Sequence, residues 1–361
     1  MKIAIDLAKK GIGLVSPNPL VGAVIVKDNE IIGKGYHKKA GTLHAERDAI
    51  NNCSKDLKGS TLYVNLEPCC HFGKTPPCTD AIIENQIGKV IIGCTDPNPL
   101  VKGQGIKKLR QAGITVIIGI LEKESLKLNE IFFNFIISKR PFVLMKYAMT
   151  MDGKIATSSG NSKWISNEES RHNVHVDRNR YSGIMIGVGT LLKDDPSLTC
   201  RLKNGHNPIR IICDTNLNTP LTSQIVKTAN SINTIIATCE KDILKHKSYL
   251  NAKCKVLVVP KKDNQVDLCT LMDILGNINI DSIIIEGGGE FNFSALNCNI
   301  VNKIQTYISP KIFGGKTSKT PIEGIGFSQI AEAITLSNPT IKYFGSDILI
   351  ESEVNRKCLQ V

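Results

Sequence analysis

Apolar and polar positions in residues 1–140 form short apolar runs that alternate with amphipathic segments. Apolar runs bounded by turn-forming residues predict β-strands, and apolar positions three or four residues apart predict helices. The predicted strands cover 20–26, 31–36, 61–66, 89–94 and 114–118, and the predicted helices cover 1–10, 44–52, 78–85, 105–112 and 121–138. Strands that alternate with helices in this way indicate a layered α/β sheet.

The pattern breaks at Lys139-Arg140-Pro141. Proline does not continue a helix, and a new apolar run begins directly after it. The second half repeats the α/β alternation without copies of the motifs of the first half. Its predicted strands cover 142–149, 183–187, 209–214, 234–238, 256–259, 282–286 and 304–309, and its predicted helices cover 168–180, 267–275 and 290–296. We therefore predict two domains, 1–140 and 141–361.

Length and composition agree with a two-domain enzyme. A chain of 361 residues exceeds what one hydrophobic core usually supports. Apolar residues make up 42% of the chain and charged residues 22%, which is ordinary for a soluble globular enzyme. The net charge of +12 is compatible with anionic ligands such as phosphorylated metabolites or nucleic acid. A solvated lysine-rich surface is the simpler interpretation, and we favour it because no dense basic run appears.

Three features of the sequence predict a cytoplasmic protein. The N-terminal segment is amphipathic with Asp6 in its middle, and it lacks the apolar core of a signal peptide. No stretch approaches the roughly 20 apolar residues of a membrane-spanning helix. Cysteines such as Cys94, Cys213 and Cys239 stand singly within apolar runs, which indicates buried thiols in a reducing compartment.

The densest group of candidate chemical residues lies between His44 and Cys78. One imidazole and two separated thiols suit a zinc ion, and three protein ligands leave the fourth tetrahedral position for water, whose pKa the metal lowers to roughly 7. The H-x-E…P-C pattern is the signature of zinc-dependent nucleobase deaminases. In such a site Glu46 would take a proton from the attacking water and pass it to the ring nitrogen and then to the leaving ammonia.

Two simpler interpretations of this group exist. The cysteines could be merely buried, or a closed structural zinc site could use Cys70 or His71 as its fourth ligand. Glu46 argues against a structural site, because such a site needs no adjacent carboxylate. The spacing of nine residues from Cys69 to Cys78 is longer than the usual C-x-x-C. We favour a catalytic zinc.

Five sequence motifs of the first half together resemble one family. They are 16–22 (SPNPLVG), 35–41 (GYHKKAG), 44–46 (HAE), the EPC and PC ends of 67–78, and 96–99 (DPNP). The family is the bifunctional riboflavin biosynthesis proteins, in which a diaminohydroxyphosphoribosylaminopyrimidine deaminase is fused to a 5-amino-6-(5-phosphoribosylamino)uracil reductase. The long cysteine-to-cysteine segment is typical of this family.

The resemblance implies roles for residues of the first domain, which would have a cytidine-deaminase-like three-layer fold. One zinc ion would be bound by His44, Cys69 and Cys78, and Glu46 would be the proton shuttle. Cys70 stands where relatives usually carry serine, and we assign the ligand to Cys69 because Pro68 precedes it in the motif. The residues expected near the pyrimidine or its ribose phosphate are Asn18, His37, His71 and Lys74.

The second half contains three further motifs. At 283–290 a buried strand runs into a glycine triplet and then a predicted helix, which suits a phosphate bound by backbone amides, although glycine turns are also common without a ligand. The segment 149–156 is followed by 162–166, which contains Trp164, and for this tryptophan core packing is the simpler interpretation. The third motif is 187–201.

Together these three motifs resemble the reductase domain of the same family, which has a dihydrofolate-reductase-like fold. The resemblance implies NADPH contacts at Ala148, Trp164, Thr190, Asp194, Thr215, Gly288, Gly289, Glu290, Phe291, Asn292, Phe293 and Ser294. It implies substrate contacts at Ser162, Arg178, Leu198, Arg201 and Glu286. Arginine suits the ribose 5-phosphate. Hydride transfer to C1′ of the opened ribose needs positioning more than acid–base groups, so we name no catalytic residue in this half.

We therefore predict a two-step enzyme with zinc and NADPH that acts on a phosphorylated pyrimidine and forms a homo-oligomer, a dimer or tetramer. A deaminase of nucleic-acid bases is one alternative, which the absence of interleaved aromatic and basic residues disfavours. A non-enzymatic zinc module with a nucleotide-binding domain is the other, and Glu46 argues against it. Neither nucleic acid nor a membrane is an expected partner.

Overall fold

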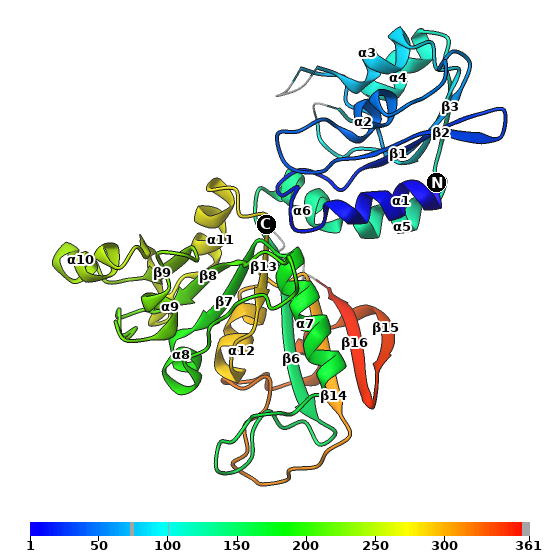
Figure 1. Cartoon of the computed structure of the whole chain (residues 1–361). Helices are drawn as coiled ribbons and strands as arrows, with labels where there is room; N and C mark the ends of the chain where they lie inside the picture. The colour runs from blue at the N-terminus through cyan, green and yellow to red at the C-terminus, as the bar shows by residue number, and fades with distance from the viewer. Residues whose placement is uncertain (73–75, 100, 356–361) are drawn as a thin grey trace. The chain divides into compact units, whose positions relative to one another are not determined.

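The structure is a computed structural model, and it describes residues 1–72, 76–99 and 101–355. The chain divides into two compact units, Met1–Lys139 and Arg140–Val361, one residue before the boundary expected from the sequence. Each unit is built around its own β-sheet (Figure 1). Among the described residues, no helix combines the length and apolar composition needed to cross a membrane.

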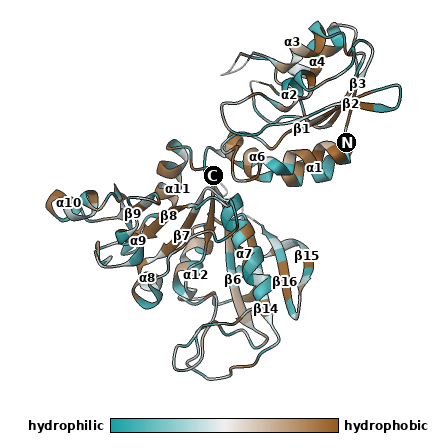
Figure 2. Cartoon of the chain, viewed as in Figure 1, coloured by the Kyte–Doolittle hydropathy of each residue, from teal (hydrophilic) through white to brown (hydrophobic). Residues whose placement is uncertain are grey.

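The first unit contains a five-stranded sheet in the order β2-β1-β3-β4-β5. The strands are β1 (Gly22–Lys27), β2 (Glu30–Tyr36), β3 (Thr61–Leu66), β4 (Lys89–Cys94) and β5 (Thr115–Ile118). Strand β1 pairs antiparallel with β2 and β3, whereas β3, β4 and β5 are parallel. Buried apolar side chains of β1 to β4 contribute to the core of this unit, and the sheet beside the β1 and β2 labels is mostly brown in Figure 2.

The helices of the first unit follow the predicted order with one difference. They are α1 (Lys2–Ala8), η1 (Lys9–Gly11), α2 (Ala45–Asn51), α3 (Cys78–Glu84), α4 (Gln104–Gln111), α5 (Glu122–Leu128) and α6 (Glu130–Ser138). The single helix expected over 121–138 is two helices, divided at Asn129. The buried Asn129 amide accepts from Leu20 N at 2.8 Å and donates to Leu20 O at 3.0 Å, so a partner distant in sequence sets the break.

Helix α2 lies directly on β2. A Cβ at Gly35 would be 2.3 Å from Ala49 N and 2.5 Å from Ala45 O, so only glycine permits this approach. The close packing fixes the N-terminal end of α2, which carries His44 and Glu46.

The second unit contains a nine-stranded sheet in the order β10-β9-β8-β7-β13-β6-β14-β16-β15. In this spatial order, each strand from β10 at one edge as far as β14 is parallel to its neighbour. Strands β16 and β15 then continue the sheet with antiparallel pairing. The strands are β6 (Phe142–Thr150), β7 (Gly183–Gly187), β8 (Ile209–Cys213), β9 (Thr234–Thr238), β10 (Lys255–Val258), β13 (Ser282–Ile285), β14 (Lys303–Ser309), β15 (Leu336–Phe344) and β16 (Asp347–Val354). A two-stranded sheet pairs β11 (Lys261–Lys262) with β12 (Gln265–Val266).

Helices cover both faces of the large sheet. On β6, Val143 and Met145 belong to the main core with residues of α11 and α12, whereas Ala148 packs with Val174 of α7. The helices are α7 (Glu168–Arg180), α8 (Val188–Asp194), α9 (Gln224–Lys227), α10 (Ile243–Asn251), α11 (Leu268–Asn277), α12 (Gly289–Asn297) and the short η2 (Ile330–Glu332). The sequence pattern missed α8, α9, α10 and the hairpin β15–β16.

Candidate active sites

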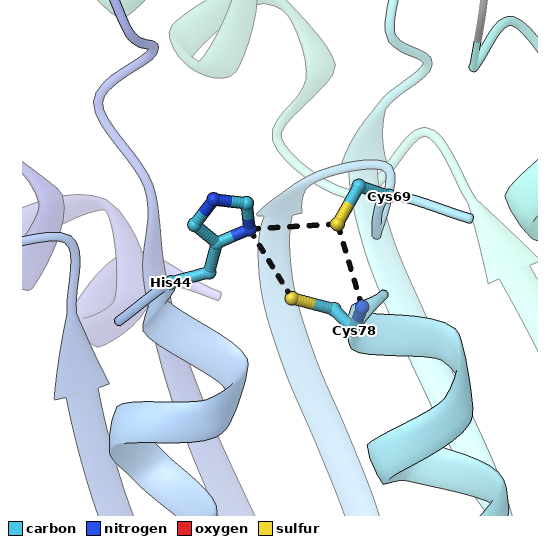
Figure 3. Close-up of side chains that lie close together, drawn as sticks. All are labelled: His44, Cys69 and Cys78. Carbon is cyan, nitrogen blue, oxygen red and sulfur yellow. Dashed lines mark hydrogen bonds between the residues drawn. The ribbon is translucent and has the colours of Figure 1, made fainter. Parts of the chain in front are cut away.

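Three segments of the first unit bring a histidine and two cysteines together (Figure 3). His44 is the N-cap of α2, Cys69 follows β3, and Cys78 is the first residue of α3. The His44 Nδ1 atom lies 3.4 Å from the Sγ atoms of both Cys69 and Cys78, and Cys78 N donates to Cys69 Sγ at 3.4 Å. All three ligand atoms lie within 4.8 Å of one another.

This cluster fits a zinc ion. Zn–S and Zn–N bonds of about 2.3 and 2.0 Å at tetrahedral angles place the donor atoms roughly 3.5 Å apart. The observed N–S separations of 3.4 Å agree with that spacing. An imidazole with two thiolates is also a donor set that zinc prefers. Cys70 is not a member of this group of ligand atoms.

The surroundings of Cys69 favour its charged form. A hydrogen bond with the Cys78 thiol and the neighbouring His44 lower the pKa of Cys69 to about 4, against the opposing effect of burial. The cluster therefore offers a thiolate at neutral pH, which is the form that binds a metal.

Glu46 is a buried carboxyl group in the first turn of α2, 3% exposed. Burial, together with repulsion from Cys69, raises the pKa of Glu46 to about 6. A carboxyl group with this pKa can both accept and donate a proton near neutral pH, as a proton shuttle must.

Of the other residues predicted for this site, Asn18 and His37 lie beside the cluster. Asn18 Nδ2 is 3.1 Å from His37 Nε2, and His37 Nδ1 is 3.0 Å from Leu43 O. The ring centroids of His37 and His44 are 5.5 Å apart. His71 lies on the segment that joins the two cysteines, two residues after Cys69, and Lys74 lies outside the described residues.

A cavity of about 540 Å³ lies in the second unit at the C-terminal ends of β7, β8 and β13. Open α/β sheets bind their ligands at this edge. Nine residues predicted from the sequence line it: Ser162, Thr190, Asp194, Thr215, Glu286, Gly288, Gly289, Glu290 and Phe291. Lys193, Lys319 and Glu323 also line it and were not predicted.

The remaining predicted residues of this half are not among those that line the cavity: Ala148, Trp164, Arg178, Leu198, Arg201, Asn292, Phe293 and Ser294. Asn292 donates to Pro321 O at 2.8 Å, and the Phe293 ring packs against Phe327 at 5.7 Å. Successive residues of a helix face different directions, and of α12 only Gly289, Glu290 and Phe291 line the cavity.

Arg178 is nevertheless connected to the cavity through Glu286. Its Nε and Nη2 atoms donate to Glu286 Oε1 at 2.8 Å and Oε2 at 3.0 Å, and its Nη1 donates to Thr199 O at 2.9 Å. Lys146 Nζ is 3.7 Å from Glu286 Oε2. Burial alone would raise the pKa of Glu286, but the two cations lower it to about 2.

Sequence reasoning missed Lys146, although a signal for it exists. It is the one charged residue in the mostly apolar strand β6, FVLMKYAMT. A charge inside a buried strand needs a partner, and here Glu286 supplies it.

Comparison with known proteins identifies the family to which the chain belongs. The family model for the RibD C-terminal domain matches residues 141–350, and the model for the cytidine and deoxycytidylate deaminase zinc-binding region matches residues 1–94. The riboflavin biosynthesis protein RibD of Actinobacillus pleuropneumoniae is 52% identical over 351 residues, which cover 97% of this chain and 93% of that protein. The chain belongs to the RibD family.

Other RibD proteins agree with this placement. RibD of Aquifex aeolicus is 40% identical, with 97% of this chain and 96% of that protein covered. A diaminohydroxyphosphoribosylaminopyrimidine deaminase/5-amino-6-(5-phosphoribosylamino)uracil reductase from Thermotoga maritima superposes with a TM-score of 0.88 at 40% identity, over 98% of this chain and 97% of that one. Acinetobacter baumannii RibD gives a TM-score of 0.87 at 32% identity, with the same coverage.

These comparisons confirm two predictions from the sequence. The first is the resemblance to the bifunctional riboflavin biosynthesis proteins. The second is the fold class, an α/β chain with a cytidine-deaminase-like N-terminal domain and a C-terminal reductase domain of the RibD type.

Proposed function

We propose that the protein catalyses two consecutive steps of riboflavin biosynthesis. The first is zinc-dependent hydrolytic deamination of 2,5-diamino-6-(5-phosphoribosylamino)pyrimidin-4(3H)-one. The second is NADPH-dependent reduction of the ribosyl side chain, which gives 5-amino-6-(5-phosphoribitylamino)uracil. The observation that carries this proposal is the His44–Cys69–Cys78 cluster with the buried Glu46 beside it, in a chain of which 97% matches a RibD protein.

Each step is assigned to one domain, residues 1–140 to deamination and residues 141–361 to reduction. The match of the deaminase model to 1–94 and of the RibD C-terminal model to 141–350 supports this division.

In the deaminase domain His44, Cys69 and Cys78 would hold one zinc ion. When bound, zinc polarises a water molecule and makes it a nucleophile near neutral pH. Glu46 would accept one proton of the attacking water and deliver it to the ring nitrogen, and would then carry the second proton to the amino group, which leaves as ammonia. Asn18 and His37, which are paired beside the cluster, orient the pyrimidine, and His71 and Lys74 contact the substrate or its ribose phosphate.

In the reductase domain the residues that line the cavity would hold NADPH and the ribosylamine. NADPH supplies the hydride. The backbone amides at the start of α12 (Gly288 to Glu290) would bind the cofactor's phosphates. The proposed cofactor contacts that line the cavity are Thr190, Asp194, Thr215 and Gly288 to Phe291. For Ala148, Trp164, Asn292, Phe293 and Ser294 the proposal rests on the family resemblance alone. The proposed substrate contacts are Ser162, Arg178, Leu198, Arg201 and Glu286.

The ion-paired Glu286 is the best-supported substrate contact. Arg178 and Lys146 keep its carboxylate charged and fix both oxygens, and Glu286 also lines the cavity. A carboxylate held in this way accepts hydrogen bonds from the substrate in one fixed direction.

The proposed two-step function is tested by measuring both reactions with purified protein. Ammonia release from the phosphoribosylaminopyrimidine should stop when a chelator removes zinc and return when zinc is restored. NADPH oxidation on the deaminated compound should continue in the presence of the chelator. Ammonia release that is indifferent to the chelator would contradict a zinc-dependent first step.

The choice between the adjacent thiols makes a second prediction. Cys70→Ser should keep zinc and ammonia release near wild-type values, because Cys70 is outside the group of ligand atoms. Cys69→Ser should lose both. Zinc content by mass spectrometry and ammonia release distinguish the two variants, and loss of zinc in Cys70→Ser would mean that the ligand was wrongly assigned.

We also propose that the protein is a cytoplasmic homo-oligomer, a dimer or tetramer. No disulfide joins the cysteines within the described ranges, as expected in a reducing compartment. Strand β15 is one of the two edges of the nine-stranded sheet, and its residues Leu336, Ile341 and Tyr343 are 48%, 61% and 74% exposed. An exposed apolar edge strand favours association.

Light scattering coupled to size-exclusion chromatography should therefore give a mass two or four times 39.5 kDa. An Ile341→Lys variant should shift the protein toward the monomer, since a charge on an edge strand opposes pairing. A wild-type protein that elutes as a monomer at all concentrations would contradict this proposal.

A further inference from the structure

Two long loops of the second unit border the cavity. We call residues 151–166, after β6, the first loop, and residues 310–329, after β14, the second loop; Figure 1 shows them in green and in orange. The first loop contributes Ile155, Ala156 and Ser162 to the cavity wall, and the second contributes Lys319 and Glu323. The relative position of the two loops therefore shapes the cavity.

A lysine of the second loop binds the backbone of the first. Lys311 Nζ donates to Trp164 O at 2.9 Å and to Ile165 O at 2.7 Å. Both carbonyls lie within three residues of Ser162. The ammonium group thus holds the end of the first loop that carries a cavity residue, and hydrogen bonds from charged donors are the strong ones.

A carboxylate of the first loop binds the backbone of the second in return. Asp152 Oδ1 accepts from Thr150 Oγ1 at 2.5 Å and from Phe313 N at 3.2 Å, and Oδ2 accepts from Gly314 N at 2.7 Å. The Thr150 hydroxyl and these amides lower the pKa of Asp152 to about 2, so it is charged throughout the physiological range.

Main-chain hydrogen bonds complete the link between the loops. Met151 N donates to Lys311 O and Ile155 N donates to Lys319 O, each at 2.9 Å. The second of these bonds joins two residues that both line the cavity. The two loops therefore form one layer, with a charged group of each bound to the backbone of the other.

We propose that Lys311 and Asp152 are positioning residues of the reductase site. Neither lines the cavity, and each acts through the cavity residues of the loop that it binds, Ser162 for Lys311 and Lys319 for Asp152. The inference rests on the proposed function, since it concerns binding of NADPH and the deaminated substrate in this cavity.

The sequence offers a specific probe of the first loop. Trp164 is the one tryptophan among the 361 residues, and its side chain is 62% exposed. Its ring stacks with Arg171 at 4.8 Å, while its carbonyl is bound by Lys311. Tryptophan emission from the whole protein therefore originates in this loop alone.

The test compares Lys311→Met with Lys311→Arg and with Lys316→Met in the full-length enzyme. Arginine can still donate to both carbonyls, and Lys316 is an exposed lysine of the same loop, so its variant removes the same charge. Acrylamide quenching of Trp164 is measured without ligands. KM and kcat are measured from NADPH oxidation on the deaminated substrate, and ammonia release is measured separately.

Lys311→Met should raise the quenching constant of Trp164 and raise KM for NADPH or substrate about tenfold, the effect of losing hydrogen bonds from a charged donor. The value of kcat should change less than KM, and ammonia release should stay at the wild-type rate. Lys311→Arg should restore both quantities. Asp152→Asn should change them in the same direction, and it serves as the second variant if Lys311→Met does not fold.

Two results would overturn the proposal. One is a Lys311→Met protein that behaves like Lys316→Met in quenching and in KM. The other is a change of quenching without a change of KM, which would mean that the loops are joined without positioning the site. A wild-type protein that does not oxidise NADPH would overturn the proposed function as well, so the two failures are distinguishable.

Discussion

Replacing Glu46 with glutamine should lower the rate of ammonia release by roughly 10²- to 10⁴-fold, the contribution of a general acid–base group. Glutamine keeps the volume of the buried side chain but cannot accept the proton of the attacking water. Zinc content should stay near one ion per chain, because Glu46 is not part of the His44–Cys69–Cys78 cluster. Ammonia release and zinc content are the two measurements.

The controls separate a catalytic loss from a folding defect. Glu84→Gln makes the same change at an exposed position of α3 and should leave ammonia release unchanged. The Glu46→Gln protein should still oxidise NADPH when it is given the deaminated compound. Ammonia release near the wild-type rate would exclude Glu46 as the proton shuttle, and loss of both reactions would show that the two sites are not independent.

Replacing Glu286 with glutamine should have the second large effect, this time on reduction. The variant leaves Lys146 and Arg178 without their anionic partner, and breaking a buried ion pair from one side costs about 3 kcal/mol or more. We expect a fall in the reductase kcat/KM of roughly 10²-fold, with ammonia release unchanged. Glu168→Gln, at an exposed position of α7, is the matched control. A wild-type kcat/KM for reduction in Glu286→Gln would show that this carboxylate is not a substrate contact.

The same variant makes a prediction about stability and pH. The pKa of Glu286 is lowered to about 2 in the folded protein, so its charge stabilises the fold above the pKa of an unfolded glutamate, about 4.3, and this contribution is lost as the pH falls toward 2. Urea unfolding followed by Trp164 emission reports on the second unit. Wild type should be more stable than Glu286→Gln at pH 7, and the difference should shrink below about pH 4. A pH-independent difference would contradict the ion pair.

The metal cluster could be predicted from the sequence because His44 and Cys69 each lie in a short motif of neighbouring residues. The motif of His44 coincides with the start of a helix, and the motif of Cys69 follows the end of a strand. The fold then brings Cys78 close to both residues. The α/β alternation could also be predicted from local patterns, because buried parallel strands are short apolar runs in the sequence.

The parts that were not predicted depend on partners distant in sequence. The helix break at Asn129 exists because its side chain binds the backbone of Leu20. The hairpin β15–β16 was not predicted, because β15 is largely exposed and contains Asn338 and Pro339 and therefore shows no apolar run. The role of Lys146 was not predicted because its partner Glu286 is distant in the sequence, and only the fold brings the two within 3.7 Å of each other.

The most direct test of the two-step account is the mass of the product formed by purified protein from the phosphoribosylaminopyrimidine and NADPH. Deamination exchanges an imino group for oxygen and adds about 1 Da, and reduction adds about 2 Da more. Wild type should give a product about 3 Da heavier, Glu286→Gln should accumulate the species about 1 Da heavier, and Glu46→Gln should leave the substrate unchanged. A wild-type product that carries only one of the two changes would contradict the assignment of both reactions to this chain.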